Sequence, residues 1–365
     1  MKKIVIMIMI AGLVAGACSK KAVDKAEENP LLSAFNTPFE TTPFERIKVE
    51  HYMPAFKEGM KKEMAEIDVI VSNPEKANFS NTIEALDSAG ELLTKVSNVF
   101  YNLNSAHTNE ELQSIAKEVA PLLSKHGDDI ALNEKLFARV KSVYEKKEGL
   151  ELTAEQNMLL DKAYKAFVRG GANLNEEQKA KLREINKELS LLSLKFEENI
   201  LKETNAFEMV LESEDDLAGL PESVVLGAAE AAKDRGYEGK WVFTIQKPSM
   251  IPFLQYSEKR DLREKIFKAY VNLGSNDNEF DNKKTASRMA ALRVEKAGLL
   301  GYKTHAHFVL ESNMAKVPEN VYKLLDQLWE PALKMAKKEA KELQAMAEQE
   351  GNDFKLQAWD WWYYA

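Results

Sequence analysis

Residues 175–200 read NEEQKAKLREINKELSLLSLKFEENI, a segment with one apolar side. Asn175 and Gln178 form a capping box, in which a polar side chain starts a helix and Gln three residues later returns a hydrogen bond. The apolar residues that follow recur at steps of three or four, the period of an α-helix: Leu182, Ile185, Leu189, Leu192, Phe196 and Ile200. The segment therefore predicts a long helix that buries one face and keeps a charged back.

Further capping boxes precede other apolar-periodic runs of the chain. They stand at Asn81–Glu84, Thr108–Glu111 and Thr153–Gln156. The last long helical segment extends from Pro318 to about Glu350 and is followed by Gly351, a residue that adopts the left-handed conformation at helix ends without strain. Most of the chain is therefore predicted to be helical.

Two short segments are typical of β-strands. They are FEMVL at residues 207–211 and WVFTIQ at residues 241–246, both rich in aromatic and β-branched residues. Between them a helix is predicted from Pro221, a favoured first helical residue, to about Arg235. The predicted fold class is mainly α, with a small β element around residues 206–246.

The first twenty residues, MKKIVIMIMIAGLVAGACSK, predict export. Two lysines precede an apolar run that is too short to span a bilayer comfortably, which is typical of a signal peptide over residues 1–17. Cys18 directly follows small residues, as in a bacterial lipobox, so we expect it to carry the lipid of the mature protein and residues 18–28 to form a polar tether. Simple cleavage after Ala17 and a retained helix are the alternatives. The expected location is the bacterial cell envelope, as a periplasmic or outer-membrane lipoprotein.

Composition excludes several classes of protein. Lys and Arg total 50 against 58 Asp and Glu, which gives a formal net charge of −8. A negative field disfavours polyanions, so no nucleic-acid partner is expected. Five His and one Cys leave little material for zinc fingers, iron–sulfur clusters or a disulfide framework.

Histidines offer the nearest approach to a metal motif. His305 and His307 are two residues apart, and on a helix such side chains point in opposite directions. Thr304 is a plausible N-cap, so one packed and one exposed histidine are expected there instead of a zinc pair. His51, His107 and His126 have no neighbour at ligand spacing and are interpreted as structural or surface residues.

The acidic segment NDNEFDN at residues 276–282 resembles a calcium-binding loop only weakly. Counted from Asp277, its sixth position is Asn282 instead of glycine, and its twelfth position is Arg288 instead of glutamate. An Asx-rich helix cap is the preferred interpretation.

The chain finishes with AWDWWYYA, residues 358–365. Each aromatic side chain has a large surface to bury, whereas terminal residues usually have few partners. We therefore expect these residues to pack against polypeptide beyond the chain as given. The alternative is a terminal segment that folds back onto the body.

Seven segments of the chain together carry a family resemblance: NPLLSAFNTPFETTPFERIKVEHYMPAF (29–56), ANFSNTIEALDSAG (77–90), LREINKELSLLSLKFEENI (182–200), LAGLPESVV (217–225), WVFTIQKPSMIPFLQYSEKRDLREKIFKAY (241–270), LRVEKAGLLGYKTHAHFVLESNMAKVPENV (292–321) and AWDWWYYA (358–365). In this order they resemble the N-terminal half of zinc metallopeptidases of the thimet oligopeptidase family, and most of all bacterial peptidyl-dipeptidase. The resemblance covers about residues 29–365.

The resemblance implies an elongated, multi-helical body with a deep channel, and zinc held by H-E-x-x-H and a later Glu. It also implies hydrolysis of short unstructured peptides, with dipeptides released from their C-termini. Residues 29–256 would form the N-terminal helical region, and residues 257–365 the start of the catalytic region.

This chain contains no H-E-x-x-H. No catalytic residue and no metal ligand is therefore assigned to it, zinc is expected only in the full-length protein, and the chain alone is predicted to be inactive. A helical peptide-binding lipoprotein and a pseudoenzyme scaffold are the alternative functions.

Overall fold

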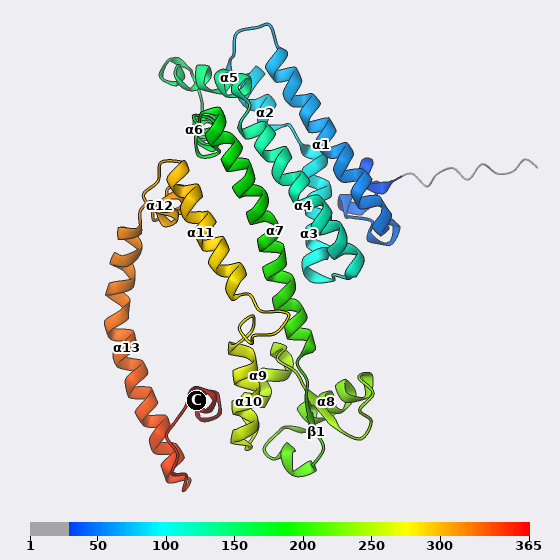
Figure 1. Cartoon of the computed structure of the whole chain (residues 1–365), viewed down its shortest axis with the longest axis vertical. Helices are drawn as coiled ribbons and strands as arrows, with labels where there is room; N and C mark the ends of the chain where they lie inside the picture. The colour runs from blue at the N-terminus through cyan, green and yellow to red at the C-terminus, as the bar shows by residue number, and fades with distance from the viewer. Residues whose placement is uncertain (1–28) are drawn as a thin grey trace, which may run out of the picture.

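The computed structural model describes residues 29–365, which form an elongated, mainly helical molecule (Figure 1). The predicted signal peptide, Cys18 and the tether lie outside the described residues. Within residues 29–365, every helix is too short or too polar to cross a bilayer. The predicted fold class, mainly α with a small β element, is confirmed.

The first apolar core lies between helices α1 (Val49–Ser72), α3 (Glu91–Ala106) and α4 (Glu110–Ala131). A Cβ atom at Gly59 of α1 would lie only 3.0 Å from the Leu93 Cα atom of α3. The missing side chain therefore lets the two helix backbones approach closely. The core that results has aromatic rings at its centre.

A second core lies at the end of the molecule where α5 and α6 meet α1 (Figure 1). Its elements are α2 (Ala85–Asp87), α5 (Glu134–Tyr144), α6 (Ala154–Arg169) and a π-helical turn, Phe79–Glu84. The capping box predicted at Thr153–Gln156 is confirmed at the start of α6.

Helix α7 (Glu176–Ala206) is the long central helix of the molecule (Figure 1). Its 31 residues span about 46 Å at 1.5 Å per residue. It packs against α4 on one side and α11 on another. The long helix predicted from Asn175 onward is thus confirmed, including its capping box with Gln178.

The small β element is a two-stranded antiparallel sheet of β1 (Met209–Leu211) and β2 (Trp241–Phe243). Helices α8 (Glu222–Asp234), α9 (Lys247–Tyr256) and α10 (Arg260–Val271) surround it. Both predicted strands exist but are shorter than predicted, because only three residue pairs share hydrogen bonds. The apolar cluster here includes residues on both sides of position 256, and the domain boundary placed there stays a prediction.

The chain then runs back along α7 and returns. Helix α11 (Lys283–Leu299) packs on α7, the short α12 (His305–Leu310) follows, and α13 (Pro318–Gln349) leads to the terminal α14 (Trp361–Tyr364). The predicted last helix is confirmed, and Gly351 after it adopts φ +85°. Short 3₁₀ turns complete the secondary structure: Pro30–Leu32, Pro38–Glu40, Phe44–Arg46, Lys147–Gly149, Glu214–Leu217 and Ala358–Asp360.

Two predicted helix starts are wrong in register. Asn78, and not Asn81, is the N-cap of the first, and Asn81 serves as the returning partner of that cap. At the second, Asn109 takes the N-cap in place of Thr108, and its side chain accepts from the backbone N–H of Leu112. In both places several polar residues stand within three positions of the helix start, and each of them could serve as the cap.

Candidate functional site

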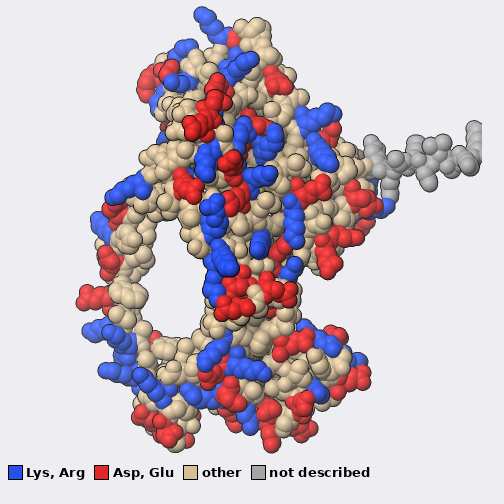
Figure 2. Space-filling model, in the orientation of Figure 1, with Lys and Arg blue, Asp and Glu red and all other residues tan. Residues whose placement is uncertain are grey.

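The most conspicuous surface feature is an opening between α13 and the body of the molecule. Figure 2 shows it passing through the molecule, with α13 on one side and the remaining chain on the other. Charged side chains of α13 gather on its outer edge, and uncharged atoms face the opening (Figure 2). Two clusters of side chains, one at each end of the opening, attach α13 and its flanking segments to the body.

Arg169, the last residue of α6, holds the end of the opening nearest α12. Its guanidinium group donates to the carboxylate of Glu311 and lies 4.4 Å from the centre of the Phe308 ring. The Tyr302 hydroxyl donates to the same carboxylate. Burial, and then the Glu311 carboxylate, raise the pKa of Tyr302. This cluster fixes α12, and hence the start of α13, to α6.

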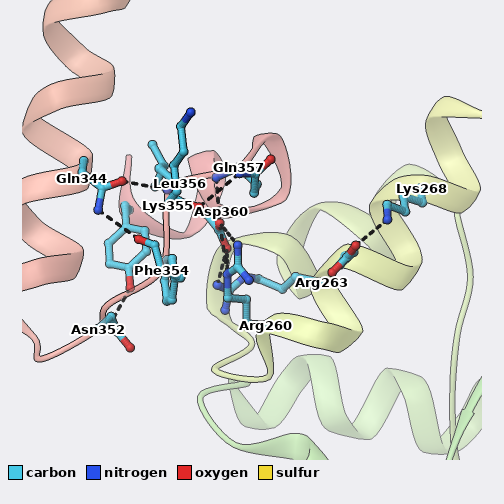
Figure 3. A network of polar contacts seen from close by, with 12 residues as sticks. Arg260, Arg263, Lys268, Gln344, Asn352, Phe354, Lys355, Leu356, Gln357 and Asp360 are labelled. Carbon is cyan, nitrogen blue, oxygen red and sulfur yellow. Dashed lines mark hydrogen bonds and ion pairs between the residues drawn. The ribbon is translucent and has the colours of Figure 1, made fainter.

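Asp360 holds the other end, as Figure 3 shows. Its fully buried carboxylate accepts hydrogen bonds from Arg260, at 3.0 and 2.9 Å, and from Arg263, at 3.0 Å. The Arg263 guanidinium also donates to the carbonyl oxygen of Ser257, at 2.6 Å. Because the ion pairs join α10 to the segment after α13, we call Asp360, Arg260 and Arg263 the Asp360 clamp.

Aromatic rings pack against both guanidinium groups of the clamp. The Arg260 guanidinium lies 4.1 Å from the Phe354 ring centre, and that of Arg263 lies 4.1 Å from the Tyr363 ring centre. Tyr364 is buried against α13, and burial, with Glu350 nearby, raises the pKa of its hydroxyl to about 12. The terminal aromatic segment thus folds back onto the body, the alternative prediction, while Trp362 remains 43% exposed.

Composition and periodicity do not single out Asp360, Arg260 or Arg263. The sequence nevertheless contains one indication, because Asp360 lies among aromatic residues. A carboxylate in such surroundings is buried only with a cationic partner. The sequence does not say which of the 50 Lys and Arg residues that partner is. The two arginines lie 100 and 97 residues before Asp360, so only the fold brings them together.

His305 and His307 do not form a metal site. His307 is held by Thr304, whose hydroxyl lies 2.8 Å from its Nδ1 atom. The buried Nδ1 atom of His305 has no partner. Burial, and then the positive charges of Arg293 and Lys296, lower the pKa of His305, and the same charges would repel a metal cation. Both rings are half-buried, which corrects the expectation of one packed and one exposed.

The other described histidines have structural partners or lie at the surface. His126 is buried in α4, with its Nε2 atom 2.7 Å from a carboxylate oxygen of Glu63 in α1. The Nδ1 atom of His51 accepts from the backbone N–H of Lys48 at the start of α1. His107 is exposed at the end of α3.

The loop at residues 276–282 binds a carboxylate of the protein itself. Glu203 of α7 accepts from the side-chain amides of Asn276 and Asn278, at 2.8 and 2.6 Å, and from the backbone N–H of Gly274. Burial opposes ionisation, but these hydrogen bonds outweigh it and lower the pKa of Glu203. Asp281 caps the start of α11 by accepting from Lys283 N. The side of the loop that faces Glu203 therefore presents donors, whereas a calcium site needs acceptors that converge on one point.

Within residues 29–365, no three His, Cys, Asp or Glu side chains are arranged to hold a metal ion. Zinc prefers three or four such ligands, so the described donor set does not fit it. Cys18, predicted to carry the lipid, lies outside this part of the chain.

Comparisons with known proteins agree with the sequence resemblance. Residues 253–365 match the model of Peptidase family M3. The chain is 35% identical over 337 residues to a dipeptidyl carboxypeptidase of Escherichia coli (strain K12), an alignment that covers 92% of this chain and 50% of that protein. It is 31% identical over 341 residues to an oligopeptidase A of Haemophilus influenzae, covering 92% and 49%. The chain thus spans about half the length of the curated relatives it matches.

Proposed function

We propose that this chain belongs to peptidase family M3 and forms one half of a zinc peptidase. The whole enzyme would release dipeptides from the C-termini of short, unstructured peptides. The similarity to a dipeptidyl carboxypeptidase over 92% of the chain carries the proposal. The part of the relatives that this chain does not match is about as long again. The proposal assigns peptide positioning to this chain and the chemistry to the other half.

The donor set of residues 29–365 supports this division. Several of their carboxylates and imidazoles are engaged in pairs and caps, such as His126 with Glu63 and Glu203 with the loop at 276–282. A zinc ion needs ligands that converge on one point, and the described residues provide none. Zinc would therefore be held by the half that this chain does not match.

The test compares two purified polypeptides, residues 18–365 and the same chain extended by the sequence encoded after Ala365. Each is given an N-terminally blocked peptide, and released dipeptide is measured with and without a chelator. We expect the extended protein to release dipeptides, the chelator to stop it, and the shorter chain to stay at background, because metal-dependent hydrolysis requires the ligands.

Two results would contradict the proposal. One is release of dipeptides by residues 18–365 at the rate of the extended protein. The other is an extended protein that binds the peptide without cleaving it, which would support the alternative of a helical peptide-binding lipoprotein or scaffold.

We also propose that Cys18 anchors the protein by a lipid in the cell envelope, on the strength of the lipobox-like sequence before it. Bacteria that express the whole chain would be grown with a labelled fatty acid. The wild-type protein should incorporate label and enter the membrane fraction, and Cys18→Ala should do neither. Wild-type protein that is shortened at its N-terminus but unlabelled would point to simple cleavage after Ala17.

A further inference from the structure

Helix α13 carries a continuous apolar face that the described chain covers at one end only. Six of its large apolar residues between positions 322 and 335 are more than half exposed, whereas Leu333 is half-buried. The six are Tyr322, Leu324, Leu325, Leu328, Trp329 and Met335. An exposed patch of this kind, rimmed by charged residues, marks an interaction surface in a soluble protein.

The repeat of the helix shows which way this face points. Leu325 and Leu343 are 18 residues apart, which is five turns of 3.6 residues, so they lie on the same side of α13. Trp329 and Ala347 are related in the same way. Leu343 and Ala347 are buried against the terminal aromatic cluster. Five turns earlier, Leu325 is 52% and Trp329 66% exposed. The terminal segment that covers Leu343 lies between α13 and α10 (Figure 1), so this side of the helix is the one turned toward the body of the molecule.

Both ends of this uncovered face are held in place. The Asp360 clamp attaches the segment after α13 to α10, and Arg169 attaches α12 to α6. A surface whose ends are fixed loses little conformational freedom on binding, and such preorganisation favours affinity. The face is thus presented as a rigid strip.

From these observations we propose that the apolar face of α13, centred on Leu325, Leu328 and Trp329, is the docking surface for a polypeptide equivalent to the unmatched half of the relatives. Their extra length supplies an occupant of the right size. Helix-in-groove packing by apolar residues at this spacing is an ordinary recognition mode. The inference rests on the proposed function only for the identity of the occupant.

The test is co-expression of the tagged chain with the unmatched half of the E. coli dipeptidyl carboxypeptidase as a separate polypeptide. We expect the two to co-purify, and Leu325→Glu/Leu328→Glu to reduce the captured amount by more than about tenfold, because charges would be buried in an apolar interface. The isolated variant should fold like the wild type, since both side chains are exposed.

A matched control places the same two glutamates on the opposite face. Lys334 and Lys337 lie nine residues, or two and a half turns, after Leu325 and Leu328, and both are exposed. Lys334→Glu/Lys337→Glu should leave capture unchanged. Equal loss in both variants would overturn the proposed face, as would equal capture by wild type and Leu325→Glu/Leu328→Glu.

Amide hydrogen exchange provides a second measurement that does not need a separately soluble half. In a single polypeptide that joins the two halves, exchange over residues 321–336 should slow by more than about tenfold relative to the chain alone. Unchanged exchange would overturn the proposal, as would a dimer of the isolated chain that Leu325→Glu/Leu328→Glu dissociates. Docking without dipeptide release would instead contradict the proposed function and leave the docking surface standing.

Discussion

Replacing Asp360 with asparagine is expected to lower the free energy of unfolding of the C-terminal segment by about 3–5 kcal/mol. The change removes one negative charge and almost no volume. The amide oxygen of the new side chain would still accept from the backbone N–H of Gln357, as the Asp360 carboxylate does at 2.9 Å. The loss would therefore come from the charge.

The size of the effect follows from the burial of the clamp. Arg263 is 1% exposed, and its Nε atom already has no hydrogen-bond partner. Without the carboxylate, its positive charge would keep only the carbonyl of Ser257 and the face of Tyr363. A buried charge left without its counter-ion is among the most destabilising changes in proteins.

Tryptophan fluorescence during urea unfolding measures this change, since Trp359, Trp361 and Trp362 lie in the affected segment. Asp353→Asn is the matched control, because Asp353 is exposed in the same segment. It should change the free energy of unfolding by no more than about 0.5 kcal/mol. Equal midpoints for the two variants would show that the clamp does not hold the segment.

Truncating Phe100 to alanine is the second large expected effect, with a cost of about 3–5 kcal/mol in the N-terminal core. Phe100 is fully buried on α3. Its ring packs edge to face against those of Phe56 and Tyr52 of α1, at centroid distances of 5.3 and 5.1 Å. Alanine would lose these contacts and leave a cavity between the two helices.

Helix content by circular dichroism and amide exchange in α1 and α3 measure the Phe100→Ala effect, since residues 29–240 contain no tryptophan. Leu328→Ala is the comparison, because Leu328 is also large and apolar but 56% exposed. It should change the stability of the chain alone by less than about 0.5 kcal/mol. A similar loss in both variants would mean that residues 322–335 of α13 are already covered.

Asp360→Asn and Phe100→Ala should also differ in their effect on docking at the apolar face of α13. Phe100→Ala acts far from α13 and should leave the exposed face as it is. Asp360→Asn releases the end of α13 that the clamp holds, so the face would lose its fixed position. Docking of the second half should therefore weaken in Asp360→Asn more than in Phe100→Ala.

Much of the fold was predictable because its signals are local. The one-sided pattern from Leu182 to Ile200 and the cap at Asn175 define α7 within a few turns of sequence. The two strands and the helix between them follow from short runs and from Pro221. Cap positions were less certain where polar residues cluster, as at Asn78 and Asn81 or Thr108 and Asn109.

The candidate site was much less predictable. An aromatic terminus was visible in the sequence, but the pairing of Asp360 with Arg260 and Arg263 was not. The apolar period of α13 was also visible, yet periodicity normally indicates a buried face. Only the structure shows that this face is covered at Leu343 and open at Leu325.

The sequence by itself determined the helical character of this protein, its small β element and its resemblance to a peptidase family. Each of these depends on apolar periodicity, helix caps or motifs that lie within short stretches of the sequence. The tertiary structure decided which charges are buried together and which part of α13 lies open. The buried charges pair residues about 100 positions apart. The covered end of α13 is buried because the chain turns back after Gly351. Neither arrangement is specified by the local pattern of neighbouring residues.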